Sequence, residues 1–109
     1  MKRNNTFRAI IKRPDEKSGH VSQILKDPEN IRKILGGDPE YIPVCFGVSI
    51  LVNAKARLNE EPFNFMYGRT TGEQIFGTVI VAGMKGSELC DCPLSMNLWK
   101  SLLSYWNKE

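Results

Sequence analysis

The 109-residue sequence has one histidine, three cysteines and no long apolar run. A membrane span needs about 18 consecutive apolar residues, and the basic opening is not followed by the apolar stretch of a secretory signal. Three cysteines are an odd number, and two of them are separated by a single residue, which suggests reduced thiols and not a disulfide framework. We therefore expect a cytoplasmic protein that does not enter a membrane.

Catalytic and metal-binding templates are also missing. His20 lies in a charged segment without a nearby nucleophile or paired carboxylate that would form a relay. Cys90 and Cys92, even when joined by Cys45 and His20, lack the usual spacing of zinc ligands. We expect no enzyme, no metal site and no cofactor.

The sequence also lacks a large excess of either charge, because the formal net charge is only +3. A protein that mimics DNA would be strongly acidic, and a nucleic-acid-binding domain would normally be more basic. The cations between Lys2 and Arg13 are typical of an edge strand protected against aggregation. Contact with nucleic acid is the less favoured alternative for this segment.

The remaining composition, 41% hydrophobic and 25% charged, is that of one globular domain over residues 1–109. Alternation, glycines and helix caps predict its elements. Strands are expected at Phe7–Arg13, Tyr41–Phe46, Val48–Val52 and Ile75–Ala82. One helix is expected to begin after Asp27-Pro28 and to end at Gly36-Gly37. A second is expected to begin after Ser95 and to carry an apolar stripe from Leu98 to Trp106.

These elements predict an α+β fold with a small, mostly antiparallel sheet and two helices packed on one face. The strand Ile75–Ala82 is nearly all apolar, so we place it at the centre of the sheet. Helices on one face leave the other face for solvent or for a second copy, and a twofold dimer is the commonest arrangement of that kind.

The polar connection between the strands is the candidate site. Arginine forks, hydroxyls and turn N–H groups suit a phosphate, and aromatic rings at alternate positions would share one face of a strand and stack on a base. The predicted ligand-binding residues are Arg57, Asn59, Phe63, Asn64, Phe65, Tyr67, Arg69, Thr70 and Thr71. The alternative is that the rings belong to the core and the polar residues solvate a hairpin.

The order of elements resembles a family of short bacteriophage and mobile-element proteins of unknown function. The resemblance covers roughly residues 7–106 and is carried by the opening strand, a helix ending in Gly-Gly, a hairpin, a Pro-x-Asn loop and a Gly-Thr strand. In this chain the Gly-Gly, Pro-x-Asn and Gly-Thr signatures are Gly36-Gly37, Pro62-Phe63-Asn64 and Gly77-Thr78. Acidic and glycine residues usually follow the hairpin in this family, whereas residues 54–57 read Ala-Lys-Ala-Arg and make the loop more basic.

The resemblance implies an origin in a phage or another mobile element and a role against host defence. Two functions against host defence fit that setting, and a structural or regulatory phage protein with no defence role is a third alternative. The first is sequestration of a small anionic, nucleotide-like immune signal in the bacterial cytoplasm, which requires binding and no chemistry. The second is inhibition of a host defence protein such as a CRISPR nuclease, which requires an extended surface. The mildly basic charge favours the anionic ligand.

Overall fold

The computed structural model describes residues 5–45, 47–68, 70 and 72–108, which form an α+β fold. From the amino end the elements are β1 (Thr6–Lys12), β2 (His20–Leu25), α1 (Pro28–Leu35), β3 (Pro39–Cys45), β4 (Val48–Asn53), β5 (Phe63–Tyr67), β6 (Glu73–Phe76), β7 (Val79–Lys85), β8 (Glu88–Cys90) and α2 (Met96–Asn107). Every strand pairing is antiparallel, which confirms the predicted class.

The main sheet has the order β2-β1-β7-β4-β3, with β8 added beside β7. The apolar segment Val79–Ala82 is therefore central, as its composition predicted, and all four of its side chains are buried. The strand expected at Ile75–Ala82 is nevertheless two strands in different sheets. The chain breaks at Gly77, whose φ of 80° lies in the region that favours glycine.

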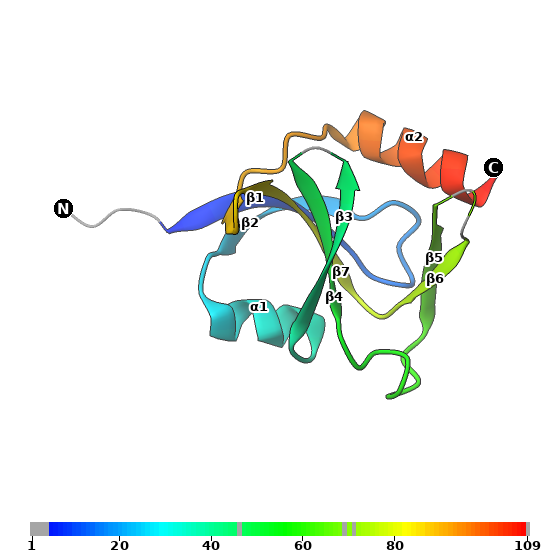
Figure 1. Ribbon diagram of the computed structural model, residues 1–109, viewed down its shortest axis with the longest axis horizontal. Coiled ribbons are helices and arrows are strands. Elements are labelled where there is room, and N and C mark those ends of the chain that lie inside the picture. The colour runs from blue at the N-terminus through cyan, green and yellow to red at the C-terminus, as the bar shows by residue number, and fades with distance from the viewer. Residues whose placement is uncertain (1–4, 46, 69, 71, 109) are drawn as a thin grey trace.

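The two helices lie on opposite faces of the sheet, so the expectation that both pack on one face is wrong (Figure 1). Alternate residues of each central strand point to opposite faces. Ile80 and Ala82 pack with α1, whereas Val79 and Val81 pack with α2 and the β5–β6 hairpin. The face that was expected to remain open for a second copy is thus covered by α1.

Local signals account for the helix boundaries. Pro28 occupies the first turn of α1, and Gly36 ends that helix in the left-handed conformation with its N–H bonded to the Arg32 carbonyl. Ser95 caps α2 by accepting a hydrogen bond from the Leu98 N–H. The sequence predicts these three boundaries, whereas Asp27, the predicted N-cap of α1, occupies that position without a side-chain hydrogen bond.

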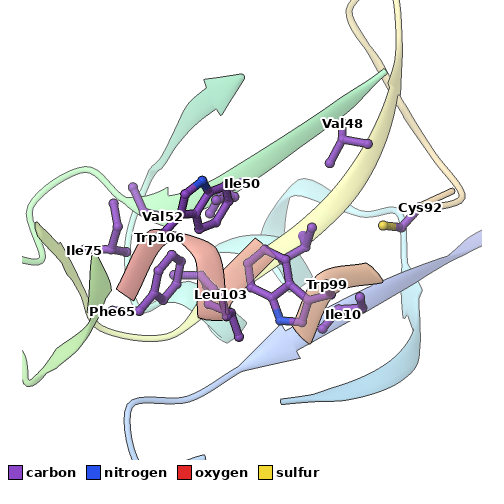
Figure 2. Packing of buried hydrophobic residues seen from close by; sticks show 12 residues of the cluster. Ile10, Val48, Ile50, Val52, Phe65, Ile75, Cys92, Trp99, Leu103 and Trp106 are labelled. Atoms are coloured by element: carbon purple, nitrogen blue, oxygen red, sulfur yellow. The ribbon is translucent and has the colours of Figure 1, made fainter. Parts of the chain in front are cut away.

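The core under α2 combines the rings of Phe65, Trp99 and Trp106 with aliphatic side chains (Figure 2). Trp99 is fully buried, and the ring of Phe65 stacks on Trp106 with centroids 6.2 Å apart. The indole N–H of Trp99 donates to the Ser18 carbonyl at 2.8 Å, so this ring also fixes the loop between β1 and β2. Burial of such rings fixes β5 against α2.

Candidate functional site

The predicted polar loop becomes a turn segment, residues 54–62, followed by the β5–β6 hairpin. Arg57 lies over the Phe76 ring, with its guanidinium carbon 5.1 Å from the ring centroid, and it donates to Gln74 at 3.3 Å. Asn59 and Thr70 are exposed. Arg69 and Thr71 lie outside the described residues.

The three predicted rings do not share one face. Phe63 is 45% exposed and meets Phe76 edge to face, whereas Phe65 is 3% exposed and belongs to the core. Tyr67 packs on Trp106 and donates its hydroxyl to the Pro43 carbonyl at 2.8 Å. The strand is irregular between Phe63 and Phe65, and such a shift disturbs the alternation on which the prediction depended.

Asn64 is a buried structural clip. Its amide nitrogen donates to the Lys12 carbonyl at 3.0 Å and to the Gly77 carbonyl at 2.7 Å, and its amide oxygen accepts from the Lys12 ammonium. The Pro-x-Asn and Gly-Thr signatures therefore meet in space. Since the amide oxygen and both donors are engaged, Asn64 binds the fold together and positions Lys12.

Lys12 opens onto the best candidate for a ligand site, a cavity of about 450 Å³ that we call the Lys12 pocket. Its walls come from β1, the β1–β2 loop, β5 and α2. The residues that line it are basic, hydroxyl-bearing, amide-bearing or apolar: Lys12, Lys17, Lys100, Ser18, Ser104, Asn64, Asn107, Phe63, Phe65 and Leu103. Among the described residues, no acidic side chain lines it.

The lysines of this pocket differ in setting. Lys12 is only 3% exposed, with its ammonium 5.7 Å from the Phe65 centroid, so its charge is held in place by the fold. Lys17 and Lys100 are exposed at the surface. One buried cation and two exposed cations around the same cavity create a positive potential within the pocket.

The second amide of the pocket is also used by the fold. Asn107 accepts from the Met66 N–H at 2.9 Å and donates to the Met66 and Leu103 carbonyls, thereby joining α2 to β5. The side chains of Asn64 and Asn107 thus both form hydrogen bonds within the protein. A ligand would be held mainly by ammonium groups, serine hydroxyls and the exposed Phe63 ring.

Glu16 forms hydrogen bonds at both ends of the loop that carries Lys17. Glu16 accepts from the Arg13 N–H at 2.8 Å and contacts the His20 ring nitrogen at 2.9 Å. The backbone hydrogen bond from Arg13, with smaller contributions from His20 and the Arg13 charge, lowers the pKa of Glu16 despite opposing desolvation. His20 therefore helps to anchor a loop.

Sequence reasoning missed Lys12 because it placed β1 at an edge. In the structure β1 pairs with both β2 and β7, so its cations are not edge protection. Arg8 instead donates to the Cys92 and Leu94 carbonyls at 2.7 and 2.9 Å. The available signal was the position of Lys12 on the same strand face as Ile10, where an inward lysine is unusual.

Other features offer less chemistry. A cavity of about 480 Å³ between β3, β4 and β7 has a single cation, Lys85, among mainly apolar and small residues. Cys45 is exposed, whereas Cys92 is buried and burial raises the pKa of its thiol. Within the described part of the chain, no group of three potential ligands could hold a metal ion. In that same part, no helix is long and apolar enough to cross a membrane.

Comparison with known proteins identifies the chain only at the level of a family. No significant match was found among curated proteins or among solved structures. Residues 7–104, which include all of β1 except its first residue, all of β2 to β8 and most of α2, match a family described as a domain of unknown function, DUF3846. The match covers the clip formed by Asn64 and every lysine of the Lys12 pocket. The chain therefore belongs to the DUF3846 family of uncharacterised domains.

Proposed function

We propose that this protein is a non-enzymatic binder that sequesters a small anionic, nucleotide-like molecule in the Lys12 pocket. The observation that carries the proposal is the charge of the pocket. Three lysines line it, and none of the described lining residues is acidic. A phosphate would be attracted to ammonium groups, which bind it as point charges.

The shape and the exposed ring support the same class of ligand. A volume of about 450 Å³ falls within the range of small-molecule sites, which is roughly 300–1,000 Å³. Phe63 offers a partly exposed ring on which a base can stack. This arrangement shifts the proposed site from the Arg57 side of the hairpin to the side formed by Phe63, Lys12 and α2.

Binding without chemistry is supported by the residue types in the pocket. The described lining residues include no histidine, carboxylate or cysteine, the groups that most often transfer protons or attack a substrate. Its two amides are engaged within the fold. The pocket is therefore better suited to holding an anion than to converting it.

The biological setting of the proposal comes from the resemblance to phage and mobile-element proteins. In that setting the ligand is an immune signal in the bacterial cytoplasm, and sequestration silences a host defence pathway. A nucleotide signal combines negative charge with a flat base, and the pocket offers lysines for the charge and the Phe63 ring for the base.

The test uses lysate from infected, defence-active cells. The purified protein is incubated with lysate, washed and heat-denatured, and the released small molecules are identified by mass spectrometry. We expect an intact anionic nucleotide from the wild type and much less from the Lys17→Gln/Lys100→Gln variant. The matched control is Lys33→Gln on α1, an exposed lysine on the opposite side of the sheet.

Release of no anionic molecule from the wild type would overturn the proposal. A host protein that remains bound in place of a nucleotide would favour the alternative, an inhibitor of a defence effector. Equal release from the wild type and the pocket variant would show that the ligand binds elsewhere.

A further inference from the structure

The two edges of the main sheet differ in their capacity to accept another strand. On β3, Pro39 and Pro43 have no backbone N–H, and the Pro43 carbonyl already accepts the Tyr67 hydroxyl. On β2, the sequence HVSQIL contains no proline, lysine, arginine or carboxylate. Within the described chain, β2 pairs with β1 alone. The Leu25 carbonyl accepts from the Asn30 side-chain amide at 3.1 Å, but β2 has no proline or charged side chain that would protect its edge against pairing.

The side chains of β2 make this edge apolar. Val21 pairs with Ile10 and Leu25 pairs with Thr6, so both point to the face of the sheet that α2 covers. Val21 is 42% exposed and Leu25 is 48% exposed. Ile24, on the other face, is buried and holds β2 on the fold. The exposed residues can therefore be changed without opening the core.

We propose that β2 pairs with β2 of a second copy of this chain. In an antiparallel pairing around a twofold axis at Gln23, Val21 of each copy lies opposite Leu25 of the other. Both exposed apolar side chains are then covered, and the two Gln23 side chains face each other. The two six-stranded sheets become one continuous sheet, and backbone groups of the two edges pair, with the Leu25 carbonyl accepting a second donor beside the Asn30 side chain.

The sequence of β2 favours a second copy over an unrelated peptide. The pairing register is self-complementary, since Val21 of each copy contacts Leu25 of the other. Within Val21–Leu25 this register brings no charged side chains opposite each other. This surface is on β2 and not on the α1 face, and it does not depend on ligand binding in the Lys12 pocket.

Sedimentation velocity over a range of protein concentrations tests this inference. We expect the wild type to form a concentration-dependent dimer and the Val21→Lys/Leu25→Lys variant to lose it, because ammonium groups would then face each other. The Val21→Lys/Leu25→Glu variant should regain the dimer, since each introduced ammonium then faces an introduced carboxylate on the other copy. Tyr41→Lys on β3, also half-exposed, is the control and should leave the dimer intact.

Circular dichroism of each variant establishes that the fold is retained before sedimentation is interpreted. A wild type that stays monomeric over the whole soluble range would overturn the inference. A dimer that survives Val21→Lys/Leu25→Lys would also overturn it. If the two double variants behaved alike, the twofold register around Gln23 would be wrong.

Discussion

Two buried asparagines hold this fold together, and their surroundings differ. Asn53 donates to the Glu61 carboxylate at 3.1 Å and accepts from the Lys55 N–H at 2.9 Å. Asn64 instead joins two backbone carbonyls to the Lys12 ammonium. Gly37 and Gly77 pack closely against the Asn53–Glu61 pair, whereas Lys12 lines a cavity. The Asn53 side chain thus lies in a tightly packed region, whereas the Asn64 side chain positions the Lys12 ammonium beside a cavity.

The largest effect should come from removing the Asn64 clip. Asn64→Ala would leave the Lys12 and Gly77 carbonyls without this donor and remove an acceptor from the Lys12 ammonium. We expect the free energy of unfolding to fall by about 3 kcal/mol. Asn53→Ala should cost less, about 1–2 kcal/mol, because its partner Glu61 is only half-buried.

Urea denaturation of both variants measures this difference. An Asn64→Ala variant as stable as Asn53→Ala would contradict the structural role assigned to Asn64. Asn64→Asp is a useful control, because it retains the size of the side chain while replacing the donating nitrogen with an acceptor.

A second prediction concerns the packing around Asn53. A Cβ atom on Gly37 would lie 2.5 Å from the Asn53 amide oxygen, so Gly37→Ala should reduce the free energy of unfolding by about 2 kcal/mol. In an Asn53→Ala background the same change should cost much less, because the clashing atoms are absent. If Gly37→Ala lowered the free energy of unfolding equally in both backgrounds, the added Cβ atom would not clash with Asn53.

A third prediction concerns pH and the loop that carries Lys17. The folded protein lowers the pKa of Glu16 below its ordinary value of 4.5. The stabilising contribution of the carboxylate is therefore complete above that value and is lost as pH falls through the lowered folded pKa. Thermal melts of the wild type from neutral to acidic pH should show this loss, and Glu16→Gln should reduce it. The effect should be small, because Glu16 is partly exposed.

The smallest effect is expected at Arg57. Arg57→Ala removes a partly exposed contact with Phe76, so the free energy of unfolding should fall by about 0.5 kcal/mol. Anion binding in the Lys12 pocket should be unchanged in a calorimetric titration with adenosine monophosphate. A marked loss of affinity would return the site to the Arg57 side of the hairpin, where the sequence first placed it.

Local sequence signals predicted the parts of the fold that depend on neighbouring residues. Pro28 and Gly36 define α1, and the run from Val79 to Ala82 defines a central strand. The placement of the helices on opposite faces was not predictable in this way, because it depends on how distant strands are ordered. Strand β2 was missed because its apolar residues do not alternate regularly.

The candidate site shows a similar limit. The sequence singled out Phe63, Asn64 and Phe65, which do line the Lys12 pocket, but it predicted that they act together with Arg57. An irregularity in β5 leaves Phe63 partly exposed against Phe76, whereas Phe65 is buried against Trp106. Lys12 and Lys17 lie at the end of β1 and in the loop that follows it, whereas Lys100 is far along the chain on α2, and only the fold brings it beside them. No spacing rule relates them.

Titration of isotopically labelled protein with adenosine monophosphate, followed by amide NMR spectra, tests the central claim most directly. We expect saturable shifts around the Lys12 pocket, weaker shifts with inorganic phosphate and none with adenosine. Lys17→Gln/Lys100→Gln should lower the affinity about tenfold or more, equivalent to about 1.4 kcal/mol, whereas Lys33→Gln should not. If adenosine monophosphate and phosphate leave the resonances of this pocket unchanged, the protein does not bind anions there and the account is wrong.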